Sequence, residues 1–206
     1  MYQLVTIPGS CSTGIHVLLN KLNIPVEIIP RDQINDYPSL VPTNQVPALK
    51  DEEKLFTEGA AIVLYLINKH NVDLNNYGGA ALFNQWLMFN YATLHPAYGK
   101  LFTLNGVMEE GEKKYEVMHA LASRVEDTWK IVDQHLADKS YMTGESPSVI
   151  DYLLAIYASW GNYFPQLTIK LGDNVLRLIE EVSQHSVFTK AYQKESVEYR
   201  IPQSAR

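Results

Sequence analysis

The sequence of 206 residues has a single cysteine, no excess of basic charge and no long hydrophobic run. One cysteine excludes an intramolecular disulfide. The sequence has 17 lysine and arginine residues against 23 acidic residues, which gives a net charge of −6. Proteins that bind nucleic acid usually carry an excess of basic residues, so this charge argues against nucleic-acid binding. The longest apolar run, residues 59–67, is too short to span a bilayer, and residues 1–10 lack the basic start of a signal peptide. We therefore expect a cytoplasmic protein whose partners include neither nucleic acid nor membrane.

The pattern of hydrophobic residues divides the chain into two parts. Hydrophobic residues make up 46% of the sequence, which excludes wholesale disorder. Residues 1–70 alternate short apolar segments with helical spacing, residues 71–79 are rich in turn formers, and residues 80–206 follow a helical period. We predict an α/β domain, a linker and an all-helical domain with these bounds.

Apolar segments in the first part predict strands at residues 2–7, 25–29, 46–49 and 54–56. Helical spacing predicts helices near residues 15–22 and 58–69. The first three elements form a βαβ unit, whose crossover is right-handed in nearly all proteins. The two short strands after it surround a charged turn and predict a hairpin.

The helical part begins with a long apolar helix from about Ala80, which is interrupted at Pro96. Residues 150–160 are apolar on nearly all sides and predict a buried central helix. Ser148 and Asp151 stand before and within its first turn with the spacing of a capping box. The segment beyond Glu195 is polar, so we expect it to be loosely held.

The lone cysteine lies in the turn Pro8-Gly9-Ser10-Cys11-Ser12, between the first strand and the first helix. A thiol at a helix N-terminus faces unpaired N–H groups, which favour the thiolate and lower the pKa of the thiol. Alternatively Cys11 is structural, because free cysteines are often buried. Ser10 and Ser12 are candidates both for helix N-caps and for hydroxyl donors to a bound thiolate.

A proline interrupts the third strand segment, in the run Asn44-Gln45-Val46-Pro47. If the Val46–Pro47 bond is cis, the backbone of Val46 is left exposed to pair with an extended peptide. An ordinary proline in an edge strand is the plainer interpretation of the same residues.

Glu58 and Gly59 stand at the start of the helix predicted near residues 58–69. A carboxylate there complements the helix dipole, and the bare N–H of glycine can bind an anion. A simple capping acid is the alternative, because capping acids are common.

Together these segments resemble the thioredoxin-like domain of glutathione transferases, and the likeness continues through the helical part, so that it covers nearly the whole chain. The cysteine turn with His16 is similar to the bacterial, cysteine-containing beta class. The other matching motifs are Gln45-Val46-Pro47-Ala48-Leu49, Thr57-Glu58-Gly59-Ala60-Ala61-Ile62, Trp86 followed nine residues later by His95, and Ser148 through Asp151.

The resemblance implies a glutathione transferase fold and an enzyme that conjugates the glutathione thiolate to small hydrophobic electrophiles, in detoxification. Cys11 would lie beside the glutathione sulfur, and His95 would reach that thiol from the helical domain. Ser10 and Ser12 would stabilise the thiolate together with backbone N–H groups. Donors aimed at sulfur lower its pKa and so raise the concentration of the nucleophile.

The resemblance also implies where glutathione binds. The γ-glutamyl ammonium would meet Glu58, and its carboxylate would meet the N–H of Gly59. The segment that pairs with the cysteinyl unit is Asn44, Gln45, Val46 and Pro47. Members of the family often carry serine at the position of Gly59, so a hydroxyl contact is lost here. Met88 and Thr93 stand where the beta class often contributes groups to the neighbouring subunit.

The family implies a homodimer, and we expect an apolar interface supplied by Phe83, Leu87, Phe89 and Tyr91. Six aromatic residues are candidates for the wall of a co-substrate pocket: Tyr91, Tyr98, Phe102, Tyr157, Trp160 and Phe164. For Tyr157 and Trp160 we favour a place in the core. The remaining histidines show no metal-ligand spacing, so we expect no metal.

Two other functions fit the same sequence. Cys11 could exchange thiols with glutathione through a mixed disulfide, which needs no second cysteine. Alternatively, the chain is a binding module or scaffold that kept the fold without catalysis, because a fold alone does not decide function.

Overall fold

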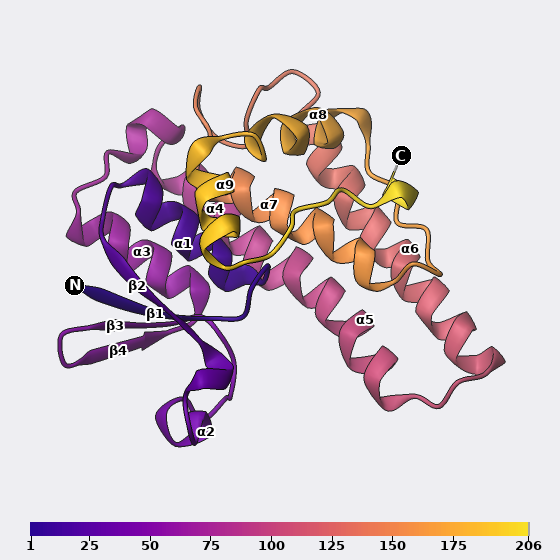
Figure 1. The fold of residues 1–206 in the computed structure, drawn as a ribbon. Helices are drawn as coiled ribbons and strands as arrows, with labels where there is room; N and C mark the ends of the chain where they lie inside the picture. Colours follow the sequence, from indigo (N-terminus) through magenta and orange to yellow (C-terminus); the bar gives the residue numbers. More distant parts are fainter. Residues whose placement is uncertain (206) are drawn as a thin grey trace.

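The first part of the chain folds as a four-stranded mixed sheet (Figure 1) in the computed structural model, which describes residues 1–205. The strands are β1 (Tyr2–Thr6), β2 (Val26–Pro30), β3 (Ala48–Asp51) and β4 (Lys54–Thr57), in the order β2-β1-β3-β4. β1 pairs in parallel with β2, whereas β3 runs antiparallel to β1 and β4. The βαβ unit and the hairpin expected from the sequence are confirmed.

Successive side chains along a strand point to opposite faces of the sheet, so the strands contribute to two separate hydrophobic clusters. Leu4 and Leu49 join the main core, together with the buried faces of α1 (Cys11–Lys21) and α3 (Gly59–Lys69). Their neighbours Val5 and Ala48 belong to a separate small cluster with Tyr37 of the short helix α2 (Tyr37–Leu40). The two helices therefore cover one face of the sheet, and the segment around α2 covers part of the other.

The regular elements described in the second part are helices and helical turns. Its helices are α4 (Ala80–Phe89), α5 (His95–Val107), α6 (Glu112–His135), α7 (Val149–Ser159), α8 (Asp173–Val182) and α9 (Ser186–Lys194). Short 3-10 turns occupy Arg31–Gln33, Leu74–Tyr77, Trp160–Tyr163 and Gln203–Ala205. An α/β thioredoxin-like sheet followed by helices is the fold class that the sequence predicts, and it is confirmed.

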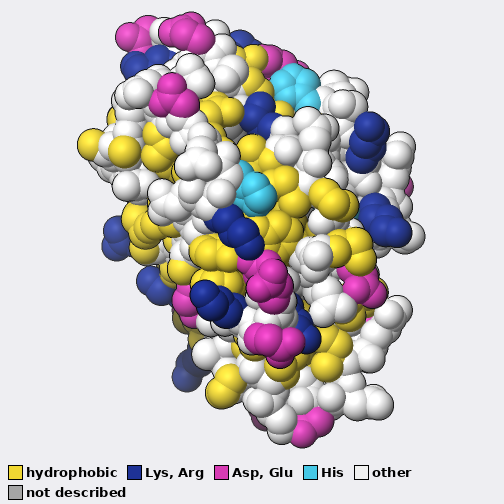
Figure 2. Space-filling model, turned by 90° about the vertical axis from the view of Figure 1, so that its left-hand side faces the viewer, with side chains coloured by type: hydrophobic (Ala, Val, Ile, Leu, Met, Phe, Trp, Pro, Cys, Tyr) yellow, Lys and Arg dark blue, Asp and Glu magenta, His cyan; other side chains and the backbone are white. Residues whose placement is uncertain are grey.

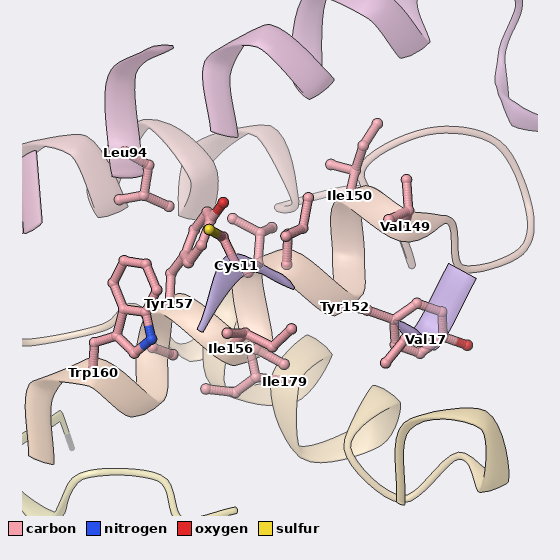
Figure 3. Packing of buried hydrophobic residues seen from close by; sticks show 14 of the residues in the cluster. Cys11, Val17, Leu94, Val149, Ile150, Tyr152, Ile156, Tyr157, Trp160 and Ile179 are labelled. Carbon is pink, nitrogen blue, oxygen red and sulfur yellow. The ribbon is translucent and has the colours of Figure 1, made fainter. Parts of the chain in front are cut away.

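The central helix α7 joins the two parts. Nearly every residue from Val149 to Ala158 is buried, and Figure 3 shows its apolar side chains packed around the start of α1. Gly14 on α1 permits this approach, because a Cβ there would overlap the side chain of Leu153. Ser148 and Asp151 form the expected capping box. One continuous core therefore connects the sheet domain with the helices.

The long helix predicted from Ala80 is interrupted one turn before Pro96. Residues Asn90–Leu94 form a π-helical turn between α4 and α5, in which the N–H of His95 bonds to the carbonyl of Asn90. Proline lacks an N–H and its ring crowds the carbonyl four residues earlier, so the widened turn accommodates Pro96 within a continuing helix.

The expectation of a loosely held C-terminal segment is wrong. Val197, Tyr199 and Ile201 pack against the main core. The backbone N–H of Leu171 donates to the carbonyl of Ala205 at 2.9 Å. The segment is polar on average, but its few apolar residues face inward, which composition alone does not reveal.

The expected dimer interface needs a similar correction. Phe83 and Leu87 are 1% and 0% exposed within their own chain, so they belong to the core. Phe89 is partly buried, and Tyr91 lines an internal cavity described below. Within residues 1–205, we find no helix with both the length and the apolar character needed to cross a membrane.

Candidate active site

A cavity of about 730 Å³ opens where the sheet domain faces α5 and the π turn before it. The sheet domain contributes the start of α1, the segment before β3 and the start of α3. The helical part contributes the π turn, α5 and one residue of α6. The lining residues from the first part include Cys11, Thr43, Gln45, Val46, Pro47, Glu58 and Gly59, and those from the second include Tyr91, His95, Pro96, Lys100, Thr103, Leu104 and Leu121.

Cys11 is the first residue of α1 and is only 7% exposed. Its sulfur donates a hydrogen bond to the carbonyl of Val46 at 3.6 Å. Burial raises the pKa of the Cys11 thiol to about 12, although the backbone N–H groups of Cys11 and Ser12 act in the opposite direction. The expected lowering of the pKa is therefore wrong, because loss of water around the thiolate outweighs the N–H groups of the helix start.

The serines on either side of Cys11 are occupied within the turn. Ser10 is the N-cap of α1, and its hydroxyl accepts from the N–H of Ser12 at 3.2 Å. The two hydroxyl oxygens lie 2.7 Å apart, and that of Ser12 also donates to the carbonyl of Ile7. Neither serine lines the cavity. The structure thus provides the capping arrangement, and their action on a bound thiolate stays a prediction.

The bond between Val46 and Pro47 is cis, as the sequence allowed. Both residues line the cavity together with Gln45, whose carbonyl accepts from the hydroxyl of Tyr37 at 2.8 Å. Asn44 has a positive φ of 57° and accepts a hydrogen bond from Arg31 on the exposed side. Asn44 therefore shapes the turn, and Gln45, Val46 and Pro47 face the cavity.

Glu58 is the N-cap of α3, with a φ of 65°, a conformation that is rare for residues other than glycine. Its side chain makes no hydrogen bond to its own helix, so it does not act as a simple capping acid. It is exposed and lines the cavity beside Gly59, the first residue of α3. The first N–H groups of a helix have no partner within the helix. A carboxylate and free N–H groups thus stand side by side, which suits a ligand that carries both an ammonium and a carboxylate.

His95 reaches the cavity from the junction of the π turn and α5. Burial lowers the pKa of its imidazole, so the ring is neutral at pH 7. Its ring centroid lies 6.5 Å from Tyr91, 5.6 Å from Tyr157 and 5.2 Å from Trp160. A neutral imidazole held among aromatic rings can accept a proton from a nearby thiol.

Of the six aromatic candidates for a pocket wall, Tyr91 is a lining residue of this cavity. Tyr157, Trp160 and Phe164 are core residues with at most 6% exposure, and Tyr98 is buried as well. The preference for a core place of Tyr157 and Trp160 is confirmed. Figure 3 shows the Tyr157 hydroxyl next to the Cys11 sulfur. Tyr157 is not among the residues that line the cavity.

Comparison with known proteins identifies the family of the first domain. The model of the glutathione S-transferase N-terminal domain matches residues 4–76. The sequence is 26% identical to glutathione S-transferase GST-4.5 of Xanthomonas campestris over 170 residues, 78% of this chain and 82% of the relative. Residues 4–76 therefore form a domain of the glutathione S-transferase N-terminal type.

Solved structures of this family share the fold across both parts. A glutathione S-transferase from Xylella fastidiosa superposes with a TM-score of 0.83 at 21% identity, covering 96% of this chain and 100% of the other. A beta class glutathione S-transferase from Sphingomonas chungbukensis superposes with a TM-score of 0.78 at 20% identity, covering 95% and 100%. The helical part, which lies beyond the N-terminal family model, thus shares the fold of these solved structures.

Sequence reasoning missed two residues that hold the turn before Cys11 in place, Glu195 and Trp160. The carboxylate of Glu195 accepts from the hydroxyl of Thr13 at 2.7 Å and the N–H of Gly9 at 3.3 Å, and it lies 2.9 Å from Nδ1 of His16. The indole N–H of Trp160 donates to the carbonyl of Gly9 at 2.9 Å. Glu195 stands in a polar segment, so no periodicity or motif could have distinguished it from a surface acid.

Three of the other histidines make structural contacts. His70 lies 2.9 Å from the hydroxyl of Tyr2, His135 lies 2.9 Å from the carbonyl of Met142, and His185 lies 3.1 Å from the hydroxyl of Tyr152. In the described part of the chain, residues 1–205, no group of three or more histidine, cysteine or acidic side chains is placed to hold a metal ion.

Proposed function

We propose that this protein conjugates the thiolate of glutathione to small hydrophobic electrophiles, as a detoxification reaction. The observation that carries the proposal is the convergence on one cavity of Val46, Glu58, the start of α3, Cys11 and His95. Glutathione is an extended peptide with one ammonium, two carboxylates and a thiol. These groups match a peptide backbone, a carboxylate, a helix N-terminus and a set of groups around sulfur.

Binding follows from the complementarity of charges. The backbone of Val46 pairs with the cysteinyl unit and sets the position of the sulfur between the sheet domain and α5. Glu58 receives the γ-glutamyl ammonium, and the N–H groups at the start of α3 receive the neighbouring carboxylate. Gln45 and Pro47 complete the wall on the side of the cysteinyl and glycyl units.

The chemistry requires a glutathione thiolate. His95 is neutral at pH 7 and is the group in the cavity wall that can accept the thiol proton. Cys11 remains protonated because burial raises its pKa to about 12, so its S–H can donate to the glutathione thiolate. The thiolate then attacks the electrophilic carbon, a C–S bond forms, and a leaving group departs or a double bond is saturated.

The co-substrate occupies the helical side of the cavity. Leu104, Leu121 and Pro96 offer apolar surface there, and Gly99 leaves open space beside them. This wall suits a small hydrophobic electrophile. Lys100 and Thr103 add polar groups at the rim.

The burial of Cys11 weighs against thiol exchange as the main activity. Exchange requires attack by a thiolate, and a thiol with a pKa near 12 is almost fully protonated at pH 7. The intact set of cavity residues weighs against a scaffold without ligand. We place the reaction in the cytoplasm, where thiols and glutathione are kept reduced. On the face shown in Figure 2, basic and acidic side chains are interspersed, which offers no continuous basic surface for nucleic acid.

Replacing Glu58 tests glutathione binding directly. Glu58→Gln removes a charge-assisted hydrogen bond to the ammonium, so we expect the Kd for glutathione, measured by titration calorimetry, to rise roughly 10- to 150-fold. The matched control is Glu53→Gln, which removes the same charge from an exposed turn between β3 and β4 and should leave the Kd unchanged. Equal affinities of Glu58→Gln and the wild type would contradict the assignment. Absence of any glutathione binding by the wild type would contradict the proposed function itself.

We also propose that the protein is a homodimer. Because Phe83 and Leu87 are buried in their own chain, an interface has to use other apolar side chains, such as Met88 and Ile131, which are 40% and 49% exposed. Sedimentation velocity at micromolar concentration should give a species of twice the chain mass of 23.4 kDa. A single species at the chain mass would exclude the dimer.

A further inference from the structure

Tyr91 carries a hydroxyl that the protein itself leaves unsatisfied. The residue lies in the π turn and lines the cavity, and its Oη is buried without a hydrogen-bond partner among the described residues. A buried hydroxyl without a partner costs free energy, so native proteins rarely keep one without a reason. The position of Tyr91 in the cavity wall points to a partner that arrives with the ligand.

The ring tip of Tyr91 lies against the first residue of α3. A Cβ added to Gly59 would overlap the ring edge of Tyr91 and lie 2.5 Å from its Oη. The phenol from the helical part therefore fills the place where a side chain of residue 59 would otherwise lie. It brings a hydroxyl to the same point at which the free N–H groups of α3 begin.

We propose that the hydroxyl of Tyr91 donates a hydrogen bond to the anionic group of the ligand bound at the N-terminus of α3. This inference rests on the proposed function, in which that group is the γ-glutamyl carboxylate of glutathione. Tyr91 is then a ligand-binding residue contributed by the helical part to a subsite otherwise built by the sheet domain.

The surroundings of Tyr91 fit a donor rather than an acceptor. Burial and the neighbouring Cys11 hold the pKa of Tyr91 well above its ordinary value, so the phenol keeps its proton. Tyr157 also has a buried unpartnered hydroxyl, but it is 0% exposed and does not line the cavity. Of these two phenols near Cys11, Tyr91 is therefore the one placed to meet a ligand.

Removal of the hydroxyl alone tests the proposal. Tyr91→Phe should raise the Kd for glutathione about tenfold, measured by titration calorimetry. The same substitution should leave unchanged the Kd for γ-aminobutyryl-cysteinylglycine, which lacks only the carboxylate in question. Tyr199→Phe is the matched control, because it removes another buried unpartnered hydroxyl that lies outside this cavity. An unchanged affinity for glutathione, or an equal loss for both peptides, would overturn the proposal.

Residue 59 provides a second, independent test. Gly59→Ser in the wild type should weaken glutathione binding, because the serine Cβ overlaps the ring of Tyr91. In a Tyr91→Ala background the same serine has room and restores a hydroxyl, so Gly59→Ser should there improve binding. The same effect of Gly59→Ser in both backgrounds would overturn the proposal. If Glu58→Gln weakens binding and Tyr91→Phe does not, the proposal for Tyr91 fails and the proposed function stands.

Discussion

We expect iodoacetamide to alkylate Cys11 of the folded, ligand-free protein at neutral pH at least about a hundredfold more slowly than a free cysteine. The reagent reacts with the thiolate, and each unit of pKa above the ordinary value lowers the thiolate fraction about tenfold. Burial raises the pKa of Cys11 from 9.0 to about 12, so the loss of thiolate is large. Because Cys11 is the sole cysteine, mass spectrometry of the intact protein reports on this one site.

The control is the same protein unfolded in guanidinium chloride, where alkylation should follow the ordinary pKa. An alkylation midpoint at or below about 8.5 in the folded protein would contradict the expectation.

The raised pKa of Cys11 also affects the stability of the folded protein. Between pH 9 and about 12 the folded protein holds a proton that the unfolded chain has released, so this contribution to stability falls as the pH rises through that range.

Asp151→Ala should lower the free energy of unfolding by about 3–4 kcal/mol. The carboxylate of Asp151 is fully buried and accepts from the N–H of Met142 at 2.8 Å and the N–H of Ser148 at 2.7 Å. It also accepts from the hydroxyl of Ser148 at 2.9 Å. The substitution leaves these buried donors without a hydrogen-bond acceptor at the start of the central helix, where burial keeps water from replacing the carboxylate. Urea unfolding followed by circular dichroism measures the loss, which corresponds to a fall in Tm of roughly 10 °C.

Asp127→Ala is the matched control for this loss. Asp127 pairs with Lys130 on the surface and its side chain is 54% exposed, so we expect a change below about 0.5 kcal/mol. Similar stabilities of the two variants would contradict the role of Asp151.

Burial raises the pKa of Asp151 to about 6, above its ordinary 3.8. Protonation of Asp151 therefore stabilises the folded protein fully below about pH 4, and this stabilisation is lost as the pH rises to about 6. The difference in free energy of unfolding between the wild type and Asp151→Ala should narrow over the same rise in pH.

Local patterns in the sequence predicted most of the fold. The four strands lie within one or two residues of the expected positions, because alternation and β-branched segments are local properties. The capping box at Ser148 and the break near Pro96 also follow from the chemistry of single residues. Helix α9 was not predicted, because its short apolar stripe, Phe188, Ala191 and Tyr192, is embedded in a polar segment.

The cavity was predicted in its residues but not in its electrostatics. Val46, Glu58, Gly59 and His95 line one cavity, as their placement in motifs suggested. The pKa of Cys11 was misjudged, since a helix start is visible in the sequence whereas burial depends on residues far along the chain. The sequence placed Tyr91 in an interface or a pocket wall. Its contact with Gly59 depends on the π turn, which rotates the residues after it relative to a regular α-helix, and the spacing of hydrophobic residues did not predict that turn.

The hydrogen bonds between Glu195 and the residues around Cys11 have a consequence for the order in which the protein folds during synthesis. The N–H of Gly9 and the carboxylate of Glu195 are 186 residues apart in the chain. During synthesis the sheet domain leaves the ribosome first, and its cysteine turn lacks the Glu195 carboxylate until that residue has been synthesised. The turn is therefore completed only after Glu195 has been synthesised, so a nascent chain carries its thiol in a turn that this carboxylate does not yet hold.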